Sequence, residues 1–141
     1  MTAYIDTSIL TAYYCPEAMS AKAEKAIASI ETPVITPLVQ VEFSSALSRK
    51  IREKSLHEID AKKIWTRFSL HRDQGLYDIR ELAMSHYSLA EKWLVTFKTT
   101  LRTLDALHLA FSFETRLSLV TGDKVLAGNA ELLGVNTQLI R

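Results

Sequence analysis

Four acidic residues of this 141-residue chain stand out by their position after or within largely apolar runs: Asp6, Glu42, Asp105 and Asp123. Asp6 directly follows the apolar run 3–5, and Asp123 follows the largely apolar run 119–122. Glu42 is the only charged residue between positions 32 and 48, and Asp105 lies in the largely apolar stretch 104–110. An ionised carboxylate is costly to bury without water or a partner, so acids in such surroundings are candidates for chemistry.

If the four acids meet, they favour the chemistry of a hard divalent cation. Carboxylates within a few ångströms of one another repel strongly, and several would take up protons unless a positive charge compensated them. Mg²⁺ or Mn²⁺ accepts carboxylate oxygens and keeps waters for itself and its substrate. Such an ion can orient a water, lower its pKa and neutralise charge on a phosphodiester.

Each acid also has a purely structural explanation. Any of them could cap a helix or pair with a base such as Arg102 or Lys124, and Asp105 suits a helix N-terminus through the helix dipole alone. Four separate structural explanations that all fall at one edge of a fold are a less economical account than one shared site. We therefore predict that the four acids form a metal site.

Strands and helices must alternate to position these acids. Short apolar runs predict strands at 3–5, 34–36, 76–79, 117–121 and 135–140. Apolar spacing and capping residues predict helices at 7–14, 17–30, 38–54, 55–74, 85–97, 103–114 and 124–133, with a Ser55-to-Glu58 capping box opening the fourth. This alternation predicts one domain over residues 1–141, a three-layer α/β/α sandwich around a central parallel sheet. Because parallel sheets bind ligands beyond the carboxyl ends of their strands, all four acids can face one cleft.

Composition narrows the class of protein further. Cys15 is the only cysteine, which excludes a disulfide framework and a cysteine zinc site. No basic segment with a long apolar stretch opens the chain, and no run approaches the length of a membrane span. We therefore expect a cytoplasmic protein without a membrane partner.

Charge is unevenly distributed along the chain. Residues 48–72 contain eight lysines and arginines and three acids, whereas the whole chain has a net charge of only +1. The pattern predicts a basic arm on a mildly acidic body. Such an arm could contact nucleic acid or protein, or simply present solvated helix faces.

At the four acids the sequence resembles the PIN-domain nucleases, and most closely the VapC-type toxins of bacterial toxin–antitoxin pairs. The matching stretches are Tyr4-Ile5-Asp6-Thr7-Ser8, Val41-Glu42-Phe43, Leu101-Arg102-Thr103-Leu104-Asp105-Ala106-Leu107-His108-Leu109-Ala110 and Thr121-Gly122-Asp123-Lys124-Val125-Leu126-Ala127. The resemblance implies a PIN-like fold and a Mg²⁺- or Mn²⁺-dependent endoribonuclease. It also implies a homodimer and a cognate antitoxin protein as partners.

The resemblance also suggests a role for each residue. It implies that Asp6, Glu42, Asp105 and Asp123 are catalytic, with Asp6, Asp105 and Asp123 binding the metal and Glu42 ligating it or orienting the attacking water. Thr121 matches a position where a hydroxyl supports the site. Arg49, Lys50 and Arg102 are candidate contacts to RNA. The competing explanation for Arg49 and Lys50 is an antitoxin or dimer interface, and for Arg102 an ion pair with an acid.

Other functions receive less support from the sequence. A non-catalytic binding or regulatory module with the same fold is the main alternative, and a phosphoacceptor role for Asp6 is a third. A phosphatase of the Asp-x-Asp type would need an acid where Ser8 stands. The four histidines have no zinc-site spacing. His108 lies three residues beyond Asp105 on the same predicted helix and could approach the site, but we expect it to be a packed or surface residue.

Overall fold

A parallel five-stranded sheet forms the centre of the computed structural model, which describes residues 1–141. The strands are β1 (Thr2–Ile5), β2 (Thr32–Ile35), β3 (Asp78–Ile79), β4 (Ser118–Thr121) and β5 (Thr137–Leu139). Their order is β3-β2-β1-β4-β5, and every neighbouring pair is parallel. Strands buried on both faces read as continuous apolar runs, and the central strand β1 is fully buried from Ala3 to Ile5.

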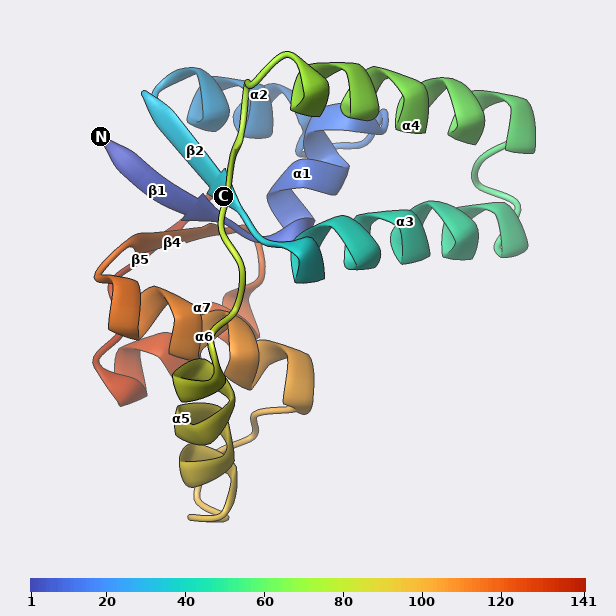
Figure 1. Cartoon of the computed structure of the whole chain (residues 1–141). Coiled ribbons are helices and arrows are strands. Elements are labelled where there is room, and N and C mark those ends of the chain that lie inside the picture. The colour runs from blue at the N-terminus through green and yellow to red at the C-terminus, as the bar shows by residue number, and fades with distance from the viewer.

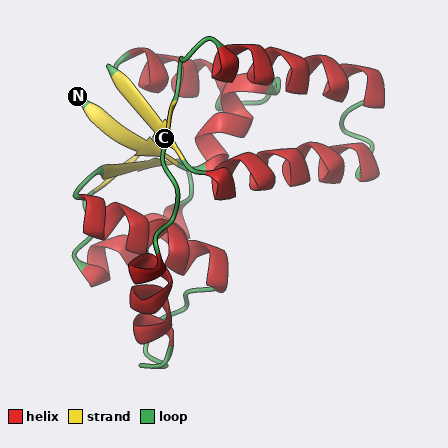
Figure 2. Cartoon of the chain, in the orientation of Figure 1, coloured by secondary structure: helices red, strands yellow, loops and turns green.

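Seven helices flank this sheet, as Figures 1 and 2 show. They are α1 (Thr7–Tyr14), α2 (Ser20–Ala28), α3 (Pro37–Arg52), α4 (Glu58–Asp73), α5 (Met84–Leu94), α6 (Thr103–Thr115) and α7 (Lys124–Leu133). The first four lie on one side of the sheet and the last three on the other. The expected three-layer α/β/α sandwich with a central parallel sheet is confirmed.

The chain changes direction across the sheet between β1 and β4. From β1 it proceeds outward through β2 to β3, and then returns to pair β4 with the other edge of β1. In open α/β sheets, ligands bind beyond the carboxyl ends of the strands at such a reversal. The loops that follow β1 and β4 are therefore the expected location of a site, and they contain Asp6 and Asp123.

An antiparallel helix pair, α3 and α4, extends away from the sheet (Figure 1). Thr36 caps α3 by accepting a hydrogen bond from the Val39 amide, and Pro37 occupies the first helical turn. This pair contains the basic segment predicted from the sequence. Of its two central aromatic residues, Phe68 is buried in the core and Trp65 is exposed.

Several element boundaries differ from those expected. The capping box at Ser55 is wrong, because the Ser55 hydroxyl donates to the Lys50 carbonyl and α4 begins only at Glu58. The helix expected over 17–30 is shorter and starts at Ser20. The Ser20 hydroxyl accepts a hydrogen bond from the Glu17 amide and donates one to the Cys15 carbonyl, which holds the preceding residues in a turn. The helix expected over 124–133 and its end at Gly134 are confirmed, with Gly134 in the left-handed conformation. No helix is long and apolar enough to cross a bilayer.

Candidate active site

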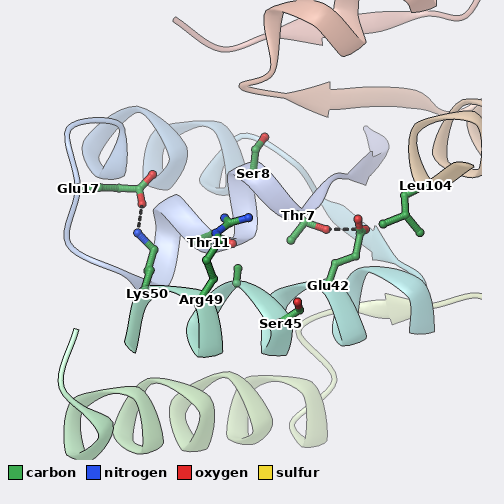
Figure 3. Close-up of a pocket in the computed structure, with 10 residues that line it drawn as sticks. Thr7, Ser8, Thr11, Glu17, Glu42, Ser45, Arg49, Lys50 and Leu104 are labelled. Atoms are coloured by element: carbon green, nitrogen blue, oxygen red, sulfur yellow. Dashed lines mark hydrogen bonds and ion pairs between the residues drawn. The ribbon is translucent and has the colours of Figure 1, made fainter. Parts of the chain in front are cut away.

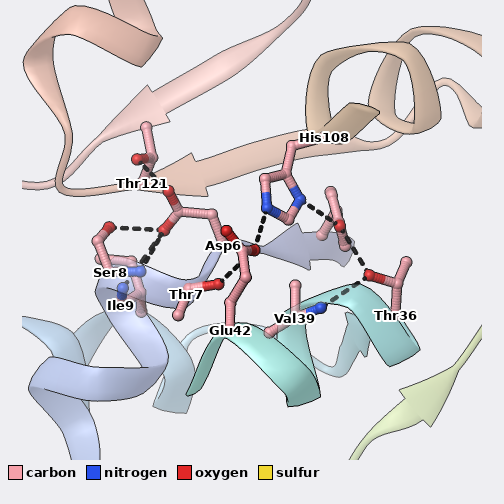
Figure 4. Close-up of polar contacts among 10 residues, drawn as sticks. Asp6, Thr7, Ser8, Ile9, Thr36, Val39, Glu42, His108 and Thr121 are labelled. Carbon is pink, nitrogen blue, oxygen red and sulfur yellow. Dashed lines mark hydrogen bonds and ion pairs between the residues drawn. The ribbon is translucent and has the colours of Figure 1, made fainter. Parts of the chain in front are cut away.

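Asp6 is a buried carboxylate directly after the last residue of β1 (Figure 4). It caps α1: its Oδ1 accepts hydrogen bonds from the Ser8 amide at 3.0 Å, the Ser8 hydroxyl at 2.6 Å and the Ile9 amide at 3.3 Å. Its Oδ2 accepts one bond, from the Thr121 hydroxyl at 2.7 Å. Burial raises the pKa of Asp6, although the hydroxyls of Ser8 and Thr121 oppose the shift.

The loop after β4 is hydrogen-bonded to the loop after β1. The Thr121 hydroxyl, which donates to Asp6, accepts a bond from the Asp123 amide at 3.0 Å. The Gly122 amide donates to the Ser8 hydroxyl at 2.9 Å. Asp123 in turn caps α7 through its Oδ1. The two acid-bearing loops therefore form one connected unit.

Replacing Thr121 with Val tests this connection. The two side chains have nearly the same shape, but Val removes the donor to Asp6 and the acceptor for the Asp123 amide. An unpaired buried polar group costs about 1–3 kcal/mol, so we expect the free energy of unfolding to fall by that amount. Chemical denaturation measures it, and a Thr121→Ser variant, which keeps the hydroxyl, should lose much less. Equal losses in both variants would mean that packing, not hydrogen bonding, accounts for the effect.

Glu42 lies on α3 and contacts α1 on its own side of the sheet and α6 on the other side. Its Oε1 accepts hydrogen bonds from the Thr7 hydroxyl at 2.9 Å and from Nε2 of His108 on α6 (Figure 4). Burial alone would raise the pKa of Glu42, but the hydrogen bond and charge of His108, together with Thr7, lower it below its ordinary value. Glu42 is therefore held as an anion.

Asp105 lies in the first turn of α6 and has no hydrogen bond or ion pair with any other side chain. It is half-buried, and burial together with the carboxylates of Asp123 and Glu42 raises its pKa, against the opposing charges of His108 and Arg102. The charges of Asp123 and Glu42 thus act on Asp105. Arg102 and Lys124 form no ion pair with any of the four acids, so that structural explanation is wrong. The capping explanation is confirmed for Asp6 and Asp123.

The fit of these acids to a divalent cation rests on their oxygens. Oε2 of Glu42, Oδ2 of Asp123 and both oxygens of Asp105 accept no hydrogen bond from the protein, and Oδ2 of Asp6 accepts only one. An all-oxygen carboxylate set of this kind suits Mg²⁺ or Mn²⁺. In this arrangement, however, no three His, Cys, Asp or Glu side chains are close enough together to hold one ion. The donor chemistry therefore fits, although Asp6, Glu42 and Asp123 each bind protein donors through at least one oxygen.

A polar groove of about 430 Å³ extends from Glu42 along α1 and α3 (Figure 3). Its wall on α3 has residues at helical spacing, ending in Arg49 and Lys50. Lys50 pairs with Glu17 across the groove at 3.2 Å, and Arg49 is exposed. Arg102 is also exposed and outside this lining, whereas Thr121 is fully buried and positions Asp6.

The sequence profile of the PIN domain family matches residues 3–132, most of the chain. The chain belongs to the PIN domain family. The family resemblance expected from the sequence is thereby confirmed. No functionally curated protein matches this PIN domain closely enough to count as a relative.

Solved structures share the fold of this PIN domain at low sequence identity. VapC20 from Mycobacterium tuberculosis, a Sarcin-Ricin loop cleaving toxin, has a TM-score of 0.72 and 16% identity over 92% of this chain and 95% of its own. FitAcB from Neisseria gonorrhoeae has a TM-score of 0.71 and 14% identity, covering 97% of this chain and 96% of its own. VapBC2 from Rickettsia felis, crystallised with a DNA fragment from its promoter, has a TM-score of 0.70 and 14% identity over the full length of both chains. At these identities the likeness shows a common fold.

The sequence interpretation missed several polar residues of this PIN domain. His108 was expected to be a packed or surface residue, with an approach to the site as the alternative; it is buried and contacts Glu42. Thr7 and Ser8 also had no assigned role, although both bind site carboxylates. The alternative for His108 rested on its spacing: residues three apart share a helix face, so His108 follows Asp105 toward the same edge.

Proposed function

We propose that this PIN domain is a Mg²⁺- or Mn²⁺-dependent endoribonuclease that hydrolyses RNA phosphodiesters in the cytoplasm, as the toxin of a type II toxin–antitoxin pair. One observation carries the proposal. Four carboxylates lie on the elements that meet at the reversal of the sheet, in the loops after β1 and β4 and on α3 and α6, and none is paired with lysine or arginine. Acids without a lysine or arginine partner at a ligand-binding edge are expected of a cation site.

In this proposal Asp6, Asp105 and Asp123 hold the ion, each through an oxygen that has at most one protein donor. A divalent cation held there supplies charge neutralisation for the phosphate and activation of a water. Glu42, fixed as an anion, orients the attacking water. The water oxygen bonds to phosphorus, the bond from phosphorus to the 3′-oxygen breaks, and the 3′-oxygen takes up a proton. The products are therefore a 5′-phosphate and a 3′-hydroxyl.

The groove beside Glu42 gives an RNA strand a path to these acids. Its far end is lined by Arg49 and Lys50, which suit backbone phosphates, and its walls present the hydroxyls of Thr7, Ser8 and Ser45 (Figure 3). Arg102, exposed beside Asp105, is a further candidate for phosphate contact. These contacts would position the strand without reading its sequence.

An antitoxin and a second copy of the chain complete the proposal as partners. Solved proteins of the same fold include VapBC2 and a toxin–antitoxin complex from Klebsiella pneumoniae, the latter with a TM-score of 0.62 and 21% identity, covering 89% of this chain and 91% of its own. These likenesses support an antitoxin partner. The homodimer rests on the family resemblance of the sequence.

Cleavage of RNA by the purified chain tests the proposal. With Mn²⁺ and a 5′-labelled RNA, we expect fragments ending in a 3′-hydroxyl, and none when EDTA replaces the metal. A 2′,3′-cyclic phosphate would contradict water attack, because that product requires the ribose 2′-hydroxyl as nucleophile. Mass spectrometry of the fragment ends distinguishes the two.

The alternative of a non-catalytic binding module is favoured by one observation, that Asp6 and Asp123 already serve as helix caps. Thermal unfolding separates the two functions. A nuclease should be stabilised by Mn²⁺, by about 2.7 kcal/mol at a metal concentration a hundredfold above Kd. A binding module should be indifferent to both Mn²⁺ and EDTA.

A further inference from the structure

A buried row of hydrogen bonds leads from the start of α3 to Glu42 (Figure 4). The Val39 amide donates to the Thr36 hydroxyl at 3.3 Å, and that hydroxyl lies 3.0 Å from the Tyr4 hydroxyl. The Tyr4 hydroxyl lies 2.7 Å from Nδ1 of His108, whose Nε2 contacts Oε1 of Glu42. Thr36 and Tyr4 are fully buried, and His108 is nearly so.

The chemistry of Glu42 fixes which atom donates at that end of the row. An ionised carboxylate can only accept, so Nε2 of His108 must carry the proton that bonds to Glu42. Burial raises the pKa of Tyr4 far above its ordinary value, so Tyr4 keeps its hydroxyl proton, and its hydroxyl lies within hydrogen-bond distance of Nδ1. Each ring nitrogen of His108 therefore has one partner, and together these partners fix the orientation of the ring.

The row begins and ends on the same helix. It connects Thr36, the N-cap of α3, to Tyr4 on β1, then to His108 on α6, and finally to Glu42 on α3. Packing supports it, because the Tyr4 ring lies 4.5 Å from the Phe111 ring between centroids. Glu42 is thus held from the opposite layer of the sandwich.

We propose that His108 is a positioning residue, which fixes one oxygen of Glu42 so that the other is presented to the reacting phosphate. This inference rests on the proposed nuclease function. Oε1 of Glu42 is occupied by His108 and Thr7, while Oε2 has no protein partner and Glu42 lines the groove. Hydrogen bonds that orient a functional side chain in this way contribute about 10- to 100-fold to activity.

Two amide substitutions at His108 separate its two contacts. The amide nitrogen of Gln lies close to the place of Nε2, so His108→Gln keeps a donor to Glu42. The amide of Asn lies close to the place of Nδ1, so His108→Asn keeps only the contact to Tyr4. We expect kcat for RNA cleavage to fall about 10- to 100-fold in His108→Asn and at most about threefold in His108→Gln, with KM unchanged in both.

His86 provides a matched control. It is a second buried histidine, which faces Glu114 on α6 and accepts from the Ala83 amide. His86→Gln should lower thermal stability without changing kcat. Equal losses of kcat in the Gln and Asn variants of His108, or a comparable loss in His86→Gln, would overturn the proposal, because the effect would then be general destabilisation.

Nuclear magnetic resonance of the imidazole nitrogens tests the same contact without RNA. The wild type should show a hydrogen-bonded Nε2 proton on His108, and Glu42→Leu should remove its protection from exchange while the signals of His86 stay unchanged. An unprotonated or unprotected Nε2 in the wild type would overturn the proposed positioning. Failure of the wild type to cleave RNA with Mn²⁺ would instead contradict the proposed function, and this spectrum distinguishes the two failures.

Discussion

Asp105→Asn is expected to abolish metal-dependent RNA cleavage and, at the same time, to stabilise the metal-free protein. Asp105 has no hydrogen bond or ion pair, and burial and two neighbouring carboxylates raise its pKa. Its charge therefore opposes folding at neutral pH, and its removal should stabilise the protein by about 0.5–1 kcal/mol, or roughly 2–5 °C in Tm. Loss of a metal-binding carboxylate should lower cleavage by about 100-fold or more. Calorimetry and an RNA cleavage assay measure the two effects.

The stability gain should also depend on pH. The folded protein binds the Asp105 proton more tightly than the unfolded chain does, so the wild type gains stability as the pH falls through the raised pKa of Asp105. Asp105→Asn lacks this gain, and the two stability curves should approach each other in acid. Glu131→Gln is the matched control, because it removes an exposed carboxylate from α7 outside the site. An Asp105→Asn variant that cleaves RNA normally, or is less stable than the wild type near neutral pH, would contradict the assignment.

Two substitutions at Asp6 should separate its structural role from its chemical one. Asp6→Ala removes the cap of α1 and leaves the donors of Ser8, Ile9 and Thr121 without an acceptor. We expect it to lose about 2 kcal/mol or more of unfolding free energy, or roughly 6–10 °C in Tm. Asp6→Asn keeps an oxygen that can cap, so it should fold with nearly wild-type stability. Both variants should lose cleavage.

The change in Tm on addition of Mn²⁺ tests whether Asp6 binds the metal. Mn²⁺ should raise the Tm of the wild type and leave that of Asp6→Asn unchanged, as equilibrium titrations followed by thermal unfolding would show. If Asp6→Asn kept the full response to Mn²⁺, Asp6 would be only a helix cap, and the metal site would have to lie elsewhere.

Sequence patterns were sufficient to place the acids at one edge of a parallel sheet. Asp6 and Asp123 directly follow predicted strand ends, and Asp105 lies in a predicted first helical turn; the structure has all three there. These predictions succeed because buried strands and helix starts leave local signatures in apolar runs and capping residues.

The remaining features depend on contacts between distant residues. The strand order could not be predicted, because the short apolar runs do not specify which neighbours each strand pairs with. His108 could not be distinguished from an ordinary core histidine, because its partners Tyr4 and Glu42 lie 104 and 66 residues away. The capping box at Ser55 failed for a related reason: its local pattern lost to a hydrogen bond with the preceding helix.

The hydrogen bonds between the loops after β1 and β4 constrain where the chain can vary in length. An inserted residue between Thr121 and Asp123 would displace the hydroxyl that holds Asp6 and the amide that holds Ser8. The turn between α3 and α4 contacts none of the four acids and lies at the far end of the helix pair (Figure 1). Insertions, affinity tags or fused domains are therefore best accommodated at that turn, whereas the short connection after β4 has a fixed length.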